Sequence, residues 1–244
     1  MADNLHRPMT QTIGILVYEN FEPIDVFGFI EPFAIARFLG QRYVEDPPYP
    51  FTTKLIAEKV EPVHSMNGPA VLPDWDCDRA RRESLDVLMV PGGLGVWPLL
   101  GEKKCKDGYE PLPDDQPLPV DVMALLDWMC EMAEKVPIIA SVCVGAAVLA
   151  KTGLLDGVPA ATNHAALMPV AHYGPRARWD NVARWVDTGK YVTSAGVSAG
   201  TDLGFHLVSR LAGRAVAEIA AKSAEYDWHR DPNQPIFYPP QADG

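Results

Sequence analysis

The chain has 244 residues, 48% of them hydrophobic and 22% charged, which is enough to bury a full core without metal or disulfide support. Its formal net charge of −11 at pH 7 argues against nucleic acid or an anionic membrane surface as a partner. Four widely spaced cysteines without a C-x-x-C pair, and no segment resembling a signal peptide or a membrane span, predict a cytoplasmic, reducing setting.

Short apolar runs alternate with helical patterns along the chain. Strands are expected over residues 13–17, 51–57, 85–90 and 137–142, with shorter ones between 65 and 75 and near 160–162, 182–186 and 191–194. Helices are expected over residues 23–39, 120–135 and 198–211, and directly after Cys143. This alternation predicts an α/β fold in which a mostly parallel sheet is covered by helices on both faces.

The same patterns divide the chain into three parts. Residues 1–11 are expected to form a flexible arm, and residues 12–223 one α/β domain. The proline-rich end, residues 224–244, is expected to be a tail that packs on the domain or on a dimer partner. Residues 101–119, rich in Gly, Lys, Asp and Pro, are expected to form an exposed insertion.

Cys143 follows a buried strand and opens a helix, with Ser141 and Gly145 two positions to either side. A nucleophile on such a sharp turn needs small neighbours, and the positive end of the helix dipole favours its thiolate. We therefore expect a reactive cysteine with a lowered pKa. The alternative is a small apolar core residue, which free cysteines commonly are.

Two further strand ends offer partners for this thiol, because sites in parallel sheets form at the carboxyl ends of the strands. The turn at Gly92 and Gly93 permits close backbone approach, so the N–H groups of Gly93 and Val144 are candidate oxyanion donors. The alternative is an ordinary strand-ending turn. Gly92-Gly93-Leu94-Gly95 does not have dinucleotide-fingerprint spacing.

Asp25 lies in the opening turn of an apolar helix after the first strand, and it is the best candidate for proton transfer with Cys143. A solvated acid stabilised by the helix dipole is the alternative, and Glu31 is the weaker rival. His164 ends another strand, either to orient substrate or as a structural histidine. The remaining histidines have no metal-ligand spacing, so no metal is expected.

Several separated motifs resemble a known group of proteins. They are I-G-I-L-V-Y-E-N-F-E-P-I-D-V-F-G, D-V-L-M-V-P-G-G, S-V-C-V-G-A, L-A-K-T-G-L-L-D-G, A-T-N-H and T-S-A-G-V-S-A-G-T-D-L. In this order they resemble the ThiJ/PfpI superfamily, of the class I glutamine amidotransferase-like fold, over about residues 12–237. The I-D-V-F-G segment, the S-V-C elbow and the tail E-Y-D-W-H-R-D-P-N-Q-P-I-F look most like the isonitrile hydratases and the similar sensor domains of some transcription regulators.

This resemblance implies a homodimeric, flavodoxin-like α/β sandwich without an organic cofactor, acting on a small molecule. In the hydratases the cysteine matching Cys143 attacks the isocyanide carbon to give a thioimidate, and the acid matching Asp25 handles protons and water. The product is an N-substituted formamide. Gly93 and Val144 would contribute backbone donors, His164 would approach the cysteine from the side, and Ile24 would lie against the substrate.

The sequence departs from the hydratase pattern at Val144, where those enzymes carry a threonine, and valine has no side-chain hydrogen bond to offer. The insertion over residues 101–119 is also expected to reshape the substrate pocket. Glyoxalase-like or amide-hydrolysing chemistry, and a non-catalytic binder or an oxidation sensor using Cys143, therefore remain alternatives. A helix-turn-helix regulator is not expected, because one such domain accounts for the length.

Overall fold

The structure is a computed structural model that describes residues 9–234 except 107, 114 and 115. Its centre is a seven-stranded sheet with the strand order β12-β13-β9-β6-β1-β2-β5. All neighbouring strands are parallel except β12 and β13. The sheet strands are β1 (Gln11–Leu16), β2 (Phe51–Ala57), β5 (Trp75–Asp76), β6 (Val87–Val90), β9 (Ile138–Ser141), β12 (Trp185–Asp187) and β13 (Tyr191–Ser194). The expected mostly parallel sheet is confirmed.

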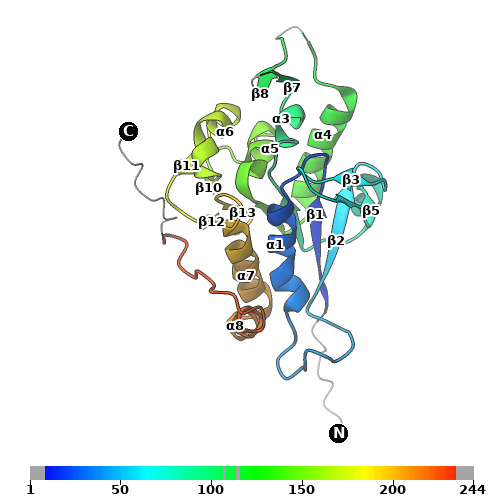
Figure 1. The fold of residues 1–244 in the computed structure, drawn as a ribbon, viewed down its shortest axis with the longest axis vertical. Coiled ribbons are helices and arrows are strands. Elements are labelled where there is room, and N and C mark those ends of the chain that lie inside the picture. The colour runs from blue at the N-terminus through cyan, green and yellow to red at the C-terminus, as the bar shows by residue number, and fades with distance from the viewer. Residues whose placement is uncertain (1–8, 107, 114–115, 235–244) are drawn as a thin grey trace.

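Helices complete a flavodoxin-like α/β sandwich. The longest are α1 (Pro23–Ile35), α4 (Val120–Lys135), α7 (Ala199–Ala212) and α8 (Arg214–Ser223). Helices α1 and α7 run side by side over the sheet, and α8 packs on α7 (Figure 1). Strands β6 and β9 are buried along their whole length, because helices cover both faces of the sheet. Their continuous apolar runs follow from this burial.

The carboxyl ends of three central strands meet at one edge of the sheet. In the parallel register, Ile15 of β1 lies opposite Met89 of β6, and Val90 of β6 lies opposite Ser141 of β9. The segments that leave these strands therefore begin next to one another. They carry Asp25, the Gly92–Gly93 turn and Cys143.

Short elements fill the connections. They are the strands β3 (Val63–His64), β4 (Ala70–Val71), β7 (Glu102–Cys105), β8 (Gly108–Pro111), β10 (Pro159–Ala161) and β11 (Arg178–Asp180), the helices α2 (Cys77–Arg82), α3 (Val96–Leu99), α5 (Ala146–Lys151) and α6 (Leu167–Tyr173), and the 3₁₀ turns η1 (Cys143–Gly145) and η2 (His164–Ala166). The expected insertion contains an antiparallel hairpin, β7–β8, at the top of Figure 1. None of the helices in the described residues has the length and apolarity that a bilayer crossing requires.

Some boundaries differ from the sequence expectations. Helix α1 ends at Ile35 rather than Leu39, and the sequence patterns did not indicate α6 or α8. Gly213 is the one residue between α7 and α8. Its φ of +95° is a left-handed conformation that glycine adopts readily, so the chain forms two helices here rather than one. Most of the expected N-terminal arm, and the tail beyond residue 234, lie outside the described residues.

Candidate active site

Cys143 stands at a bend between β9 and a helix, as the sequence indicates. Its backbone has φ +57°, in the left-handed region that is uncommon for residues other than glycine and asparagine. The Cys143 N–H donates to the Ala195 carbonyl at 3.2 Å, which ties the bend to the end of β13. A Cβ atom at Gly145 would lie 2.3 Å from the Val90 carbonyl oxygen, so only glycine fits beside this turn. The sheet therefore fixes the thiol in one place.

Asp25 is fully buried in the first turn of α1 and faces this bend. Its Oδ2 accepts a hydrogen bond from the Gly92 N–H at 2.7 Å, whereas Oδ1 has no partner in the described residues. Glu31, the rival acid, is exposed further along the same helix. Of the two carboxylates, Asp25 is thus the one that lies at the strand ends.

Gly92 is where the acid and the cysteine come together. A Cβ atom at this position would lie 2.8 Å from Asp25 Oδ2, 2.9 Å from Cys143 Cβ and 2.9 Å from the Val144 nitrogen. Any larger residue would separate these groups. Gly93, with φ +109°, follows directly, and its N–H makes no backbone hydrogen bond to a described residue. Gly92 is thus the glycine of the turn that lies against Asp25 and Cys143, and the role of Gly93 as a backbone donor stays a prediction.

Asn163 supplies a contact that the sequence analysis missed. Its Nδ2 donates to Cys143 Sγ at 3.4 Å, and its Oδ1 accepts from the backbone N–H groups of Ala165 and Ala166 at 3.0 and 3.3 Å. These two bonds orient the amide so that its NH₂ group faces the sulfur. The ring of His164, expected beside the cysteine, instead lies with Nε2 3.2 Å from the Ala183 carbonyl oxygen. The position of the Asn163 amide after a strand end was the signal in the sequence that could have identified it.

Val197 is a second residue that the sequence did not indicate. It is β-branched, yet it has φ +33°, a backbone conformation that such residues rarely adopt. Strained backbone of this kind gathers at functional sites. Here it directs the Val197 N–H to the Cys143 thiol, which also faces the Val144 N–H. Three N–H donors from separate segments, with Asn163 as the third, thus surround one sulfur.

Burial controls the protonation of both central groups. It raises the pKa of Asp25 to about 8, with a smaller increase from Glu22, while the hydrogen bond from Gly92 acts in the opposite direction. Burial, followed by the negative charge of Asp25, raises the pKa of Cys143 to about 12, against the effect of the three N–H donors. The expectation of a lowered thiol pKa is therefore wrong, because desolvation outweighs the short helix that follows Cys143.

At pH 7 the resting pair accordingly holds two protons, one on sulfur and one on the carboxyl group. A neutral carboxyl group donates a proton, and the carboxylate left behind is a base beside the thiol. Asp25 and Cys143 are thus arranged to give a proton and a sulfur nucleophile to the same bound atom. No thiolate is needed before substrate arrives.

Val144 and Ile24 are two more of the expected site residues. Val144 is buried next to the cysteine, so its backbone N–H rather than its side chain is what it offers. Ile24 is 52% exposed on α1, next to Asp25 in the sequence.

Tyr18, just after β1, donates its O–H to the Pro91 carbonyl, and burial, Asp25 and Cys143 together raise its pKa. Within the described residues, no group of His, Cys, Asp and Glu side chains is arranged to hold a metal ion.

Comparisons with known proteins show which proteins this chain is similar to. A family model described as the DJ-1/PfpI family matches residues 118–210, which include Cys143 and Asn163. The structure resembles a ThiJ/PfpI family protein from Pseudomonas syringae with a TM-score of 0.70 and 24% identity, over 100% of this chain and 84% of that one. Over residues 118–210 the chain is thus similar to the DJ-1/PfpI family, and its fold resembles that of a ThiJ/PfpI protein.

Two curated relatives of the chain have different functions. An isonitrile hydratase of Pseudomonas putida is 27% identical over 221 residues, covering 89% of this chain and 79% of the relative. The HTH-type transcriptional regulator GbdR of Pseudomonas aeruginosa is 25% identical over 217 residues, covering 89% of this chain. The chain spans about half the length, 51%, of that regulator.

Proposed function

We propose that this protein is a cysteine-dependent isonitrile hydratase of the DJ-1/PfpI superfamily, which converts an isocyanide and water into an N-substituted formamide. The observation that carries the proposal is the buried pair of Asp25 and Cys143 around Gly92, one a proton donor near neutral pH and the other a soft nucleophile. The similarity to the hydratase of Pseudomonas putida supports it. No cofactor enters the reaction.

The first half-reaction places a proton and the sulfur on one carbon. Asp25 donates its proton to the terminal carbon of the isocyanide, and Cys143 Sγ bonds to the same carbon, which leaves a thioimidate with a C=N bond. The thiol proton passes to the new Asp25 carboxylate. The N–H groups of Asn163, Val144 and Val197 stabilise negative charge that develops on sulfur.

In the second half-reaction Asp25 works in both directions. Its proton goes to the thioimidate nitrogen, and the resulting carboxylate accepts a proton from a water molecule that attacks the carbon. When the C–S bond breaks, the hydroxyl proton moves to sulfur, the product leaves as a formamide, and both groups regain their resting protons.

Among the described residues, Asp25 is the charged side chain that shifts the pKa of the Cys143 thiol, and such a site suits an uncharged substrate. The exposed apolar side chains of Ile24 and Leu94 lie next in sequence to Asp25 and to Gly93. We therefore expect isocyanides with an apolar substituent to react best, because burying that substituent contributes about 0.8 kcal/mol per CH₂ group.

Infrared spectroscopy tests this function directly, by following loss of the isocyanide stretch of an alkyl isocyanide together with formamide production. Wild type is expected to turn over slowly and Cys143→Ser not at all, and mass spectrometry of quenched wild type is expected to show one substrate mass added at Cys143. Equal formamide production by both proteins, or none by wild type at any pH from 5 to 9, contradicts the proposal.

A non-catalytic small-molecule binder is the second candidate, and the similarity to GbdR favours it. In that role the raised pKa of the Cys143 thiol is useful, since a protonated thiol resists oxidation. Tight isocyanide binding without turnover would support this candidate. Glyoxalase-like or amide-hydrolysing chemistry is the remaining alternative and is tested with the corresponding substrates.

We also propose that the protein is a homodimer. Ile24 and Phe27 expose 52% and 44% of their surface on α1 beside the site, and apolar residues so placed are commonly covered by a partner. Light scattering is expected to give twice the 26.7 kDa of one chain, and a mass of one chain contradicts the dimer.

A further inference from the structure

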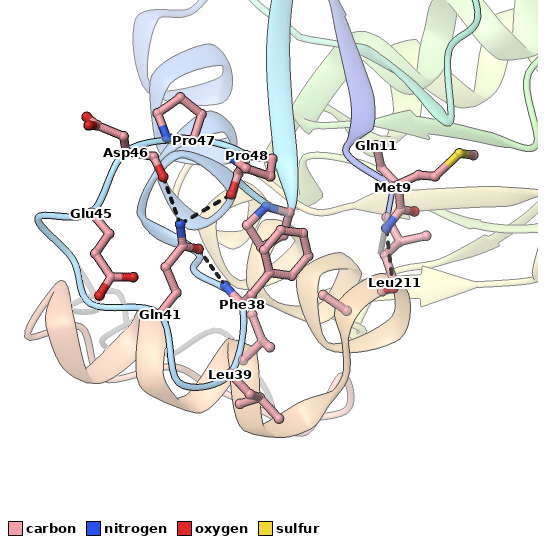
Figure 2. Close-up of a pocket in the computed structure, with 13 residues that line it drawn as sticks. Met9, Gln11, Phe38, Leu39, Gln41, Glu45, Asp46, Pro47, Pro48 and Leu211 are labelled. Atoms are coloured by element: carbon pink, nitrogen blue, oxygen red, sulfur yellow. Dashed lines mark hydrogen bonds between the residues drawn. The ribbon is translucent and has the colours of Figure 1, made fainter. Parts of the chain in front are cut away.

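A cavity of about 740 Å³ lies at the ends of α1 and α7 that are remote from Cys143. Its outer wall is the segment of residues 36–50, which joins α1 to β2 without regular secondary structure, and Figure 2 shows its lining. A loop of this length in a compact domain commonly has a function. The volume falls within the range of small-molecule sites, about 300–1,000 Å³.

The loop is held in shape by the side chain of Gln41. Its Oε1 accepts from the Phe38 N–H at 3.1 Å, and its Nε2 donates to the carbonyl oxygens of Asp46 and Pro48 at 3.3 and 3.2 Å (Figure 2). The side-chain amide of Gln41 thus links the two halves of the loop. The shape of the loop is therefore fixed by bonds within the protein.

A second set of contacts fixes the loop to α1. The Arg37 guanidinium lies over the rings of Tyr43 and Tyr49, 4.7 and 4.3 Å from their centroids, and donates to the carbonyl oxygens of Ala34 and Ala36. These contacts close the end of the helix, and the Arg37 Nε atom has no hydrogen-bond partner among the described residues. Arg37 is not among the residues that line the cavity.

Apolar side chains form most of the cavity wall. They come from the start of β1, from the loop, and from the junction of α7 and α8: Met9, Phe38, Leu39, Pro47, Pro48, Pro50, Leu211, Ala212 and Val216. The three prolines have no backbone N–H, so this wall offers carbonyl acceptors and few donors. An apolar ligand body fits such a surface.

The polar lining has a consistent character. Among the described residues that line the cavity, the side-chain N–H donors are the amides of Gln11 and Gln41, and both donate within the protein, Gln11 to the Leu211 carbonyl at 3.4 Å. The other polar side chains of this lining are the carboxylates of Glu45 and Asp46, neither of which forms a salt bridge with a described residue. The charged groups of the described lining are therefore both negative.

We propose that this cavity is a binding site for a small hydrophobic organic cation, such as an aryl-alkyl amine, separate from the Cys143 site. The apolar wall takes the hydrocarbon part. The ammonium group lies at the loop, toward the carboxylates of Glu45 and Asp46. An anion of the same size would meet these two carboxylates and no cationic side chain among the described lining residues.

Isothermal titration with three matched probes tests the site. They are 2-naphthylmethylamine, a cation at neutral pH, the uncharged 2-naphthylmethanol, and the anion 2-naphthaleneacetate. We expect the amine to bind at least tenfold more tightly than the acetate, with the neutral alcohol between them. The Glu45→Gln/Asp46→Asn double variant is expected to remove the preference for the amine over the alcohol. Equal affinity for all three probes in wild type, or no binding of any of them, overturns the proposal.

Two variants of equal charge change separate this cavity from general attraction to an acidic protein. Leu39 is 65% exposed at the cavity, and Ile219 is 52% exposed on α8 outside the lining, so arginine at either position leaves the core intact. Leu39→Arg is expected to weaken amine binding at least tenfold, and Ile219→Arg to leave it within about twofold. Equal effects of the two variants place the amine elsewhere and contradict the site.

Discussion

Two aspartates among the described residues are fully buried, and their surroundings differ completely. Asp202 of α7 pairs with Arg184, accepts from the Tyr226 hydroxyl at 3.1 Å and from the His229 N–H at 3.0 Å, and so uses both oxygens. Asp25 of α1 accepts a hydrogen bond from Gly92 through Oδ2, and its Oδ1 has no partner in the described part of the chain. A buried carboxylate with complete compensation holds structure together, whereas one left incomplete keeps a proton that can be given away.

The two sites are also joined through the backbone. Arg184 accepts from the Ala195 N–H at 2.8 Å through its carbonyl group, and Ala195 in turn accepts from the Cys143 N–H. The Arg184 N–H donates to the Pro232 carbonyl, which anchors this residue of the tail to the domain. The Asp202 cluster thus supports the frame in which Asp25 and Cys143 meet.

Removing the charge at Asp202 is expected to have the largest effect on stability. Asp202→Asn leaves the Arg184 guanidinium buried and unpaired, and loss of one partner of a buried pair costs about 3–5 kcal/mol. Urea denaturation measures the free energy of unfolding. The exposed pair of Asp156 and Arg176 is the control, and Asp156→Asn is expected to cost less than about 1 kcal/mol. Equal losses would contradict the distinction.

Removing the proton at Asp25 is expected to affect catalysis instead. Asp25→Asn should lower kcat/KM for an isocyanide by about a hundredfold or more, because Asn cannot exchange the proton. Glu31→Gln, an exposed position on the same helix, should leave the rate within about twofold. Near-wild-type turnover by the Asp25 variant would contradict its role as acid and base.

Stability of the Asp25 variant should change with pH in a definite direction. The folded pKa of about 8 lies above the value of about 3.9 for an unfolded aspartate, so wild type loses stability as pH rises from about 4 to about 8. The Asp25→Asn variant lacks this pH-dependent loss of stability. Its melting temperature relative to wild type should therefore rise between pH 5 and pH 8, and a constant difference would show that Asp25 ionises normally.

Adding a hydroxyl group beside the nucleophile should sharpen the site. Val144→Thr changes little volume and offers a hydrogen bond to the substrate nitrogen, worth roughly 1.5–3 kcal/mol if that atom gains charge in the transition state, or about ten- to a hundredfold in rate. The infrared assay measures it. A fast wild type that gains nothing from threonine would mean that another donor, with Asn163 nearest the sulfur, already fills this role.

The smallest expected effect separates Asn163 from its neighbour His164. Asn163→Ala removes a donor to sulfur, which should raise the thiol pKa and slow iodoacetamide alkylation of Cys143 about tenfold at pH 8. His164→Ala, whose ring faces the Ala183 carbonyl, should change the alkylation rate less than twofold. The reverse order would return the histidine to the position that the sequence analysis gave it.

These contrasts show what can be predicted from the sequence. The alternation of buried strands and helices, and the small residues around Cys143, are local patterns, so β2, α4 and the bend appear in the sequence almost at their observed bounds. Positions after the ends of predicted strands extend this to the choice of Asp25 and Gly93. Residue types alone carry that much of the site.

The rest depends on distances between segments that are far apart in the chain. Whether Cys143 is a thiol or a thiolate depends on burial by the whole fold, and a helix-start pattern does not report that burial. Asn163 was missed because its amide is oriented by the Ala165 and Ala166 N–H groups one turn later. Val197 was missed because its positive φ is imposed by tertiary structure.

The central claim is that Asp25 keeps its proton at neutral pH, and carbon-13 NMR of aspartate-labelled protein tests it most directly. The side-chain carboxyl signal that disappears in Asp25→Asn is followed between pH 3 and pH 10 in wild type. We predict that this one signal titrates with a pKa near 8, well above the other aspartates. Titration near the ordinary value of about 3.9 would contradict the account, because Asp25 would then have no proton to give at pH 7.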